Sequence, residues 1–229
     1  MSAFKIMSSK RYVLFSNHLV TILSYTLLFI GFSIHTTLAQ SITPYRTLRY
    51  QQTIGQSDIY TCGAAAVATL LTHFYKFPVS ESEIVDLAEK MMLERGKKSQ
   101  DSGIDALALK KTLKLKGIDA DVVETSLESI RKYFNRGGLP IVIHVNIPQP
   151  HYILAVGLVE DRLIVADPTL GRGVFPLETL SSQKGFTGIA IIAKPSEQFV
   201  QVAKQQQQIS KDWADGRLQR FKAMKRNVL

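Results

Sequence analysis

Cys62 is the single cysteine of this 229-residue chain, and its surroundings favour chemistry at the thiol. The polar residues 56–61 precede it and Gly63 follows with three alanines, so a polar loop leads into the first turn of an apolar helix. Free N–H groups at a helix N-terminus favour an anion, and a thiol attacks as its thiolate. The local sequence leaves two interpretations open: a nucleophile, or a small buried core residue, as most free cysteines are.

His151 and Asp167 are the residues that could complete a catalytic site with this thiol. His151 begins one expected strand, and Asp167 ends the next, just before Pro168. Residues 159–162 close a hairpin between the two strands, so the side chains should be cross-strand neighbours. In this geometry a carboxylate orients an imidazole. Asp167 alone, before a proline, would be an ordinary turn residue, so the pairing gives the hypothesis its weight.

Gln56 lies six residues before Cys62, in the same loop. Its side-chain N–H, together with the backbone N–H of Cys62, could bind a developing oxyanion. Two other histidines are less informative. His73 lies inside the first expected helix, which favours a packed or surface role, and His144 lies in mid-strand with no partner that the sequence identifies.

The elements that must position these residues fall into two groups along the chain. Apolar residues recur at helical spacing up to residue 135, and strand-like patterns begin at Leu139. Helices first and antiparallel strands second is an α+β layout. Helices are expected over 62–76, directly after the capping box Ser80–Glu83, from 102–105 to Leu115, and over 127–135. Strands are expected over 120–124, 140–146, 151–159, 162–166 and 187–193, with a short strand at 173–176 and a helical turn after it.

Residues 1–39 have the pattern of a secretory signal. Three basic residues precede an apolar stretch over 19–34, and a small-x-small site ending at Ala39 would leave Gln40 as the mature N-terminus. An uncleaved anchor is the alternative, since 12–34 could nearly span a bilayer. The sequence therefore predicts an exported protein, periplasmic or extracellular, with an inner-membrane anchor as the second option.

Residues 40–195 are expected to form the folded domain. They hold 18 basic and 16 acidic groups, so the formal net charge of +9 comes mainly from the two ends of the chain and gives no argument for nucleic-acid binding. With one cysteine no intramolecular disulfide can form, and stability must come from the core.

Residues 196–229 form a basic, glutamine-rich tail, expected to be helical or partly disordered. Its sparse apolar residues could make a weak stripe on a basic helix, which would dock on a partner or on anionic lipid. A solvated appendage is the simpler interpretation. The apolar residues in question are Ile209, Trp213, Phe221 and Met224.

Taken together, these motifs resemble papain-like cysteine peptidase family 39, the double-glycine leader or bacteriocin-processing peptidases. The resemblance covers roughly residues 48–195. The family usually has Asp before Cys-Gly, whereas Thr61 stands there in this chain. The motifs are Gln56 with Cys62-Gly63, Gly103-Ile104, His151-Tyr152 with Gly157, Asp167-Pro168, and the closing segment 186–192.

The resemblance implies a papain-like fold, in which the helix of Cys62 packs on an antiparallel sheet that holds the other site residues. Cys62 would attack a peptide carbonyl, His151 would transfer the proton, Asp167 would orient the imidazole and Gln56 would stabilise the oxyanion. Gly63 and Tyr152 would contact the substrate. No metal or other cofactor is needed. Relatives cut after Gly-Gly or Gly-Ala, which a narrow cleft would explain.

The resulting prediction is an exported, stand-alone cysteine endopeptidase acting on a peptide or secreted protein, since neither a transporter nor an ATP-binding motif is found in the sequence. Its partners would be that substrate and components of an envelope secretion or surface-appendage system, with membrane contact only through an uncleaved N-terminal segment. Two alternatives stay open: a non-catalytic, peptidase-like binding module in such a system, and an acyl or amide transferase that uses the same cysteine.

Overall fold

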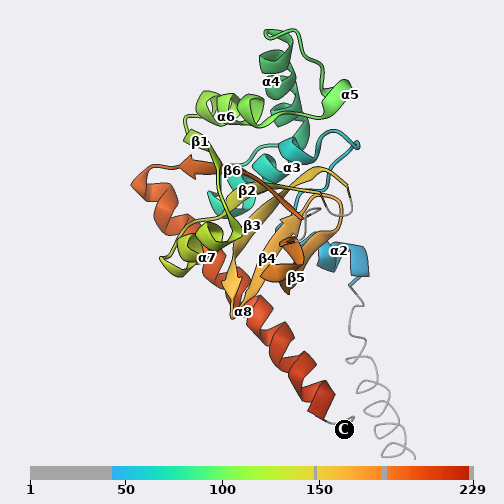
Figure 1. Cartoon of the computed structure of the whole chain (residues 1–229), viewed down its shortest axis with the longest axis vertical. Coiled ribbons are helices and arrows are strands. Elements are labelled where there is room, and N and C mark those ends of the chain that lie inside the picture. The colour runs from blue at the N-terminus through green and yellow to red at the C-terminus, as the bar shows by residue number, and fades with distance from the viewer. Residues whose placement is uncertain (1–42, 147–148, 182–184, 227–229) are drawn as a thin grey trace, which may run out of the picture. The chain divides into compact units, whose positions relative to one another are not determined.

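The computed structural model describes residues 43–146, 149–181 and 185–226 (Figure 1). The predicted signal segment, 1–39, lies outside these ranges. Among the helices of the described ranges, none combines the length and apolar character needed to cross a bilayer.

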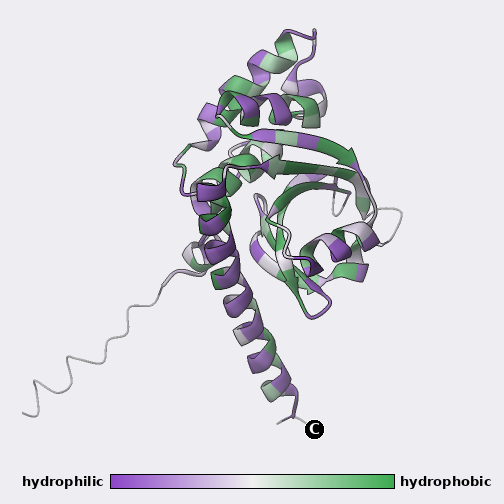
Figure 2. Cartoon of the chain, turned by 90° about the vertical axis from the view of Figure 1, so that its left-hand side faces the viewer, coloured by the Kyte–Doolittle hydropathy of each residue, from purple (hydrophilic) through white to green (hydrophobic). Residues whose placement is uncertain are grey.

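One six-stranded antiparallel sheet holds the fold together, in the order β1-β6-β2-β3-β4-β5. Strands β2 to β5 follow one another as neighbours, and β6 returns to pair between β1 and β2. The sheet is strongly curved (Figure 2). Its strands are β1 (Asp119–Glu124), β2 (Ile141–Val145), β3 (His151–Val159), β4 (Arg162–Asp167), β5 (Gly171–Pro176) and β6 (Phe186–Lys194), with a 3-10 turn η2 (Leu177–Leu180) before β6.

The central strand β3 is buried on both faces, which explains its nearly continuous apolar sequence. Its residues alternate between two apolar clusters. Leu154 and Val156 pack with the helix of Cys62, whereas Ile153 and Ala155 pack with helix α7 (Leu127–Asn135) on the opposite face. This double burial holds the strand that begins with His151 in a fixed place.

The helical lobe positions the cysteine. Helix α3 (Cys62–Thr69) is buried along its whole length and continues as a π-helical turn, η1 (Leu70–Phe74). Its small residues let it lie close to the sheet and to its neighbouring helices. The predicted cap at Ser80 forms, because its hydroxyl accepts from the N–H of Glu83, although the Glu83 carboxylate pairs with Lys116 instead of completing the capping box. Asp105 caps the next long helix by accepting from the N–H of Ala108. The remaining helices of this lobe are α4 (Glu81–Leu93), α5 (Ser99–Ser102) and α6 (Ala106–Leu115), whereas α2 (Tyr45–Arg49) lies beside β5.

The C-terminal segment forms one 30-residue helix, α8 (Glu197–Arg226). Its N-terminal half packs on η1 and β3, and its C-terminal half extends beyond the sheet (Figures 1 and 2). Gln207 is buried against the sheet, where its Nε2 donates to the carbonyls of Val156 at 2.6 Å and Gly138 at 2.9 Å. The buried face therefore differs from the expected apolar stripe, and its members are Ala203, Gln207, Ser210 and Ala214.

The predicted α+β class with a papain-like arrangement is confirmed: an N-terminal helical lobe places the helix of Cys62 against an antiparallel sheet. The expected strands and helices are all present, with ends that differ by a few residues.

Candidate active site

Cys62 is the first residue of α3, and its side chain is only 6% exposed. The backbone N–H of Tyr152, on β3, lies 3.4 Å from its Sγ and donates to it. The thiol thus lies where the helix N-terminus meets the start of the central strand. Both elements are rigid, so the position of Sγ is well defined.

The pKa of the Cys62 thiol is raised above its ordinary value. Burial is the main cause, and the N–H groups of Tyr152 and Gly63 oppose it only in part. The helix N-terminus therefore does not produce a thiolate in the resting site. At neutral pH this shift favours the protonated thiol.

His151 and Asp167 are hydrogen-bonded, with His151 Nε2 3.2 Å from Asp167 Oδ2. Both side chains are buried. The hairpin of β3 and β4 brings them together, as the sequence predicted, although the register shifts between Ala155 and Gly157. The other ring nitrogen, Nδ1, lies 2.8 Å from the carbonyl oxygen of Gln149.

This arrangement favours the protonated imidazole of His151, because both ring nitrogens face acceptors and each must donate to be satisfied. Burial lowers the pKa of His151, but the hydrogen bonds to Asp167 and Gln149 and the charge of Asp167 outweigh it, so that the net pKa is raised. Asp167 therefore stabilises an imidazolium, the species that a proton-transfer step would form.

The carboxylate of Asp167 is itself held in place. Its Oδ1 accepts from the N–H groups of Thr169 at 2.7 Å and Leu170 at 3.0 Å. The turn that supplies these donors is tied to the N-terminal segment, since Tyr50 Oη donates to the carbonyl of Thr169 at 2.6 Å and the N–H of Gln56 donates to that of Pro168 at 3.1 Å.

No hydrogen bond joins Sγ of Cys62 to either ring nitrogen of His151 in the described part of the chain. The ring nitrogen free of Asp167 is Nδ1, and it faces Gln149. A proton transfer from the thiol therefore needs Nδ1 to exchange the Gln149 carbonyl for Sγ. Catalytic hydrogen bonds often tighten in this way only when substrate is bound.

The side chain of Gln56 is directed to other partners. Its Nε2 donates to the carbonyl of Asp58 at 2.8 Å, and its Oε1 accepts from Thr169 Oγ1 at 2.8 Å. It does not line the cleft that contains Cys62. The structure thus brings Cys62, His151 and Asp167 together and leaves Gln56 beside them, tied to the turn after Asp167.

A cleft of about 300 Å³ opens beside the thiol. Its walls are the loop before α3, helix α5 with the two residues after it, His144 of β2, and the start of β3 with the two residues before it. A larger cavity lies elsewhere in the molecule and is described below. The lining residues are Ile59, Tyr60, Cys62, Gln100, Asp101, Ser102, Gly103, Ile104, His144, Gln149, Pro150, His151 and Tyr152.

Comparison with known proteins agrees with this geometry. The peptidase C39 family model matches residues 50–198, which include every residue of the site. The chain belongs to the peptidase C39 family. This is a family of cysteine peptidases, so the resemblance predicted from the motifs is confirmed.

Three relatives illustrate the match of this C39 chain. The mesentericin Y105 transport and processing ATP-binding protein of Leuconostoc mesenteroides is 27% identical over 150 residues, 64% of this chain. A double-glycine motif protease from an AMS/PCAT transporter, solved with a leader peptide, is 26% identical with a TM-score of 0.52, over 70% of this chain and 96% of its own. The peptidase domain of Streptococcus ComA, at 24% identity and a TM-score of 0.52, over 63% of this chain and 98% of its own, shares the fold.

The curated relatives are far longer proteins. The chain spans about a fifth of their length, 19% in both the Leuconostoc protein and the Lactococcus lactis protein that processes and transports lactococcin G. In this chain, α8 lies almost wholly after the family match, and α2 lies before it.

His144 is a residue of the cleft whose role the sequence did not identify. Its Nδ1 lies 3.1 Å from Thr187 Oγ1, and its ring packs edge-on against Tyr152 at 4.7 Å between centroids. The pKa of His144 is lowered, by burial first and by the nearby His151 second. The β2–β3 pairing places His144 opposite Tyr152, and only the register could have revealed this.

Gly63 and Tyr152, expected at the substrate, also serve the packing of this C39 domain. A Cβ on Gly63 would lie 2.7 Å from Cδ1 of Leu109 and 3.1 Å from Cδ2 of Tyr152. Gly63 is buried, whereas Tyr152 lines the cleft. Burial, followed by the charges of Asp105 and Cys62, raises the pKa of the Tyr152 phenol to about 12, so it stays a neutral donor.

Proposed function

We propose that this chain is a cysteine endopeptidase that cleaves a peptide or secreted protein after a Gly-Gly-like pair. The observation that supports this most is the placement of Cys62 and His151 in one cleft, with the imidazole fixed from behind by Asp167. A nucleophile, a base and a group that orients the base are the parts that acyl transfer needs.

The Nδ1 proton that bonds to the Gln149 carbonyl is first lost to solvent, and substrate displaces that carbonyl. Nδ1 of the neutral His151 then takes the proton of Cys62 Sγ. The thiolate attacks the scissile carbonyl carbon, and the carbonyl electron pair moves to oxygen. The imidazolium then gives its proton to the leaving nitrogen as the C–N bond breaks, which leaves a thioester. Water attacks the thioester, Nδ1 takes a proton from the water, and Sγ leaves. The hydrogen bond from the Nε2–H of His151 to Asp167 stays in place throughout.

Stabilisation of the oxyanion falls to the backbone N–H of Cys62 and to Gln56. In the resting site Gln56 Nε2 is bonded to the Asp58 carbonyl, so it serves only after turning to the substrate. The hydrogen bond from Thr169 Oγ1 to Gln56 Oε1 keeps the amide near the site. It also fixes the orientation of the amide, because Oε1 must be the atom that faces Thr169.

The proposed preference for glycine rests on the family's double-glycine members and on the aromatic and backbone groups that line the cleft. Tyr152 and His144 pack edge-on at one wall, and the buried Ile104 with Gly103 forms another. The similarity to the double-glycine motif protease solved with a leader peptide supports this proposal.

We further propose that the peptidase is exported, with residues 1–39 as its signal or anchor. The basic start, the apolar stretch and the small-x-small site support export. The substrate would then meet the enzyme outside the cytoplasm, in an envelope secretion or surface-appendage system. Fractionation of cells expressing the full chain checks the location, and mass spectrometry of the protein tests cleavage after Ala39.

The test of the activity uses the full chain and leader peptides that differ only at the Gly-Gly pair. Mass spectrometry should find cleavage after the second glycine, none in the peptide with Val-Val at that place, and none with Cys62→Ala. Cleavage that persists in Cys62→Ala, or that is equally fast at Val-Val, contradicts the proposal.

A non-catalytic binding module is the second candidate, and the resting geometry favours it. Sγ is buried and its pKa is raised, and Nδ1 of His151 is bonded to Gln149 instead of to the thiol. In this case the native chain and Cys62→Ala bind the Gly-Gly leader with equal affinity, and neither cuts it. Any cleavage that depends on Cys62 rejects this candidate.

A further inference from the structure

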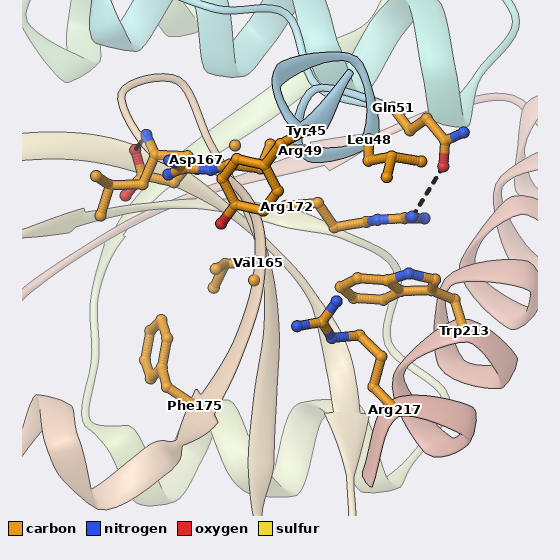
Figure 3. A pocket seen from close by; sticks show the side chains of 13 residues that line it. Tyr45, Leu48, Arg49, Gln51, Val165, Asp167, Arg172, Phe175, Trp213 and Arg217 are labelled. Atoms are coloured by element: carbon orange, nitrogen blue, oxygen red, sulfur yellow. Dashed lines mark hydrogen bonds between the residues drawn. The ribbon is translucent and has the colours of Figure 1, made fainter. Parts of the chain in front are cut away.

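A cavity of about 620 Å³, roughly twice the volume of the catalytic cleft, lies between α2, the strands β4 and β5, and α8 (Figure 3). Three arginines from three different elements line it: Arg49 of α2, Arg172 of β5 and Arg217 of α8. Segments more than 150 residues apart in the sequence thus gather positive charge at one place.

None of the three guanidinium groups has a carboxylate partner within the described residues. Arg172 donates to the neutral amide oxygens of Gln51 at 3.1 Å and Gln52 at 3.4 Å. Arg49 donates to a backbone carbonyl, that of Leu170. The charges are held in position and are left without an anion.

Asp167 lines the same cavity, but its carboxylate is committed elsewhere. One oxygen is bonded to His151, and the other accepts from the N–H groups of Thr169 and Leu170. The lining thus holds three arginines against one carboxylate, which gives it a net positive formal charge.

Trp213 fixes the geometry of two of the arginines. Both guanidinium groups lie beside its indole, with Cζ atoms 3.7 Å (Arg172) and 5.3 Å (Arg217) from the ring centre (Figure 3). The Nε of Arg172 is buried and has no hydrogen-bond partner among the described residues. Burial, together with the charge of Arg217, lowers the pKa of Arg172 to about 10, a penalty that a bound anion would relieve.

Apolar side chains make up one wall of the cavity. Leu48 and Leu170 are about half exposed at its mouth, and Val165 and Phe175 lie deeper. Gly173 adds no side chain to the strand wall of the cavity; a Cβ there would lie 3.5 Å from Cγ2 of Val165. The cavity thus offers a cationic end beside an apolar wall.

We propose that this cavity is a binding site for an oxyanion, a carboxylate or a phosphate, that is attached to an apolar or aromatic body. The guanidinium groups of Arg172 and Arg217 bind the oxyanion, and the apolar body packs on Leu48 and Phe175. Guanidinium groups suit both anions, because a carboxylate or a phosphate can accept two parallel N–H···O hydrogen bonds from one arginine.

This site lies next to the peptidase site and shares one residue with it, since Asp167 lines the cavity and also bonds to His151. Two of its three walls, α2 and the part of α8 with Trp213 and Arg217, lie outside residues 50–198, the stretch that matches the family. The site is therefore an addition to the C39 domain, and its ligand need not be a peptide. The proposal stands or falls independently of the activity of Cys62.

The single tryptophan of the chain gives a direct test, because Trp213 fluorescence reports on this cavity alone. The full chain is titrated at low ionic strength with 3-phenylpropionate, phenyl phosphate and the neutral 3-phenylpropionamide. A saturable change with at least one anion, and none with the amide, is expected. The anion that saturates identifies carboxylate or phosphate as the natural group.

Arg217→Gln should weaken this binding about tenfold or more, the loss expected for a charge-assisted hydrogen bond. Arg220→Gln is the matched control, an exposed arginine of the same helix that does not line the cavity, and its Kd should stay within twofold. Because Arg217 is exposed, its replacement leaves the core intact. Equal binding of the amide, equal loss in both variants, or no saturation by either anion overturns the proposal.

Discussion

At the residue scale, the site depends on which acceptors the two ring N–H groups of His151 bond to. His151 donates from Nε2 to Asp167 and from Nδ1 to the Gln149 carbonyl, and the thiol of Cys62 lies nearby without a bond to the ring. In the proposed mechanism, proton transfer therefore waits for the substrate. This differs from a site that holds a thiolate and an imidazolium in advance.

Asp167→Asn tests the electrostatic role of this carboxylate. Since Asp167 raises the pKa of His151, the free base appears only as pH rises through that raised value, above 6.5. In the native enzyme the acid limb of kcat/KM should have its midpoint above 6.5. In Asp167→Asn it should move to lower pH, while kcat falls ~10³–10⁴-fold because the imidazole loses its orientation.

The pH profile of peptide cleavage over pH 5 to 10 provides the measurement. Asp86→Asn, which removes an exposed carboxylate on α4, should leave both the midpoint and kcat unchanged. An acid limb that stays in place in Asp167→Asn would show that another group controls it.

Alkylation of Cys62 reports the state of the resting thiol. Because burial raises its pKa above 9.0, the thiolate forms only at high pH, and iodoacetamide should react more slowly at pH 7 than with free cysteine. The rate should rise with a midpoint above pH 9. With one cysteine in the chain, mass spectrometry follows this site alone.

His151→Gln is the control, and it should leave that midpoint almost unchanged since no bond joins the two side chains. A midpoint well below pH 8 in the native chain that is lost in His151→Gln would mean that a thiolate–imidazolium pair exists before substrate binds.

At the element scale, α3 reaches the sheet because its first turn is built of small residues. Gly63 has Leu109 of α6 on one side and Tyr152 of β3 on the other. Any side chain there would push apart the two elements that position Cys62 and the start of β3. Close packing of this turn is therefore a condition for the site.

Gly63→Ala should destabilise the protein by about 1–3 kcal/mol, the usual cost of adding a methyl group to a filled core. Gly216→Ala is the matched change in another helix, where the nearest atom would be the flexible end of Arg220 at 3.7 Å. There the higher helix propensity of Ala should stabilise by up to about 1 kcal/mol. Urea unfolding of both variants measures the change in the free energy of unfolding, which should be opposite in sign. Equal changes in the two variants would contradict the packing argument.

At the scale of the whole molecule, α8 joins the end of the chain to the central strand. Its contact depends on Gln207, a polar residue that the sequence placed in a run of four glutamines. The bonds from its Nε2 to Val156 and Gly138 span 51 and 69 residues of sequence. Through this contact, α8 also brings Trp213 and Arg217 to the arginine-lined cavity.

Gln207→Ala should lower the free energy of unfolding by about 1–3 kcal/mol, because it leaves two buried carbonyl groups without a donor. Gln205→Ala, at an exposed position of the same run, should change it by less than about 0.5 kcal/mol. Thermal unfolding compares the two, and indistinguishable Tm values would mean that α8 does not rely on this contact.

The sequence alone determined the parts of this protein that local chemistry controls. The cap at Ser80, the helix after the Cys62 loop and the β3–β4 hairpin follow from short-range patterns. The proximity of His151 and Asp167 follows as well, since they lie 16 residues apart across a two-residue turn. The resemblance to the family motifs then linked these local features to a predicted fold and a predicted site.

Only the tertiary structure decided the features that depend on distant segments. The partner of Nδ1, the burial that raises the pKa of Cys62 and the orientation of Gln56 depend on packing between β3, α3 and the turn after β4. The buried face of α8 runs through glutamine and small residues, because side chains that fit closely against a strand matter more there than apolar ones. The cavity of three arginines is the clearest case, since no pattern along the chain relates Arg49, Arg172 and Arg217.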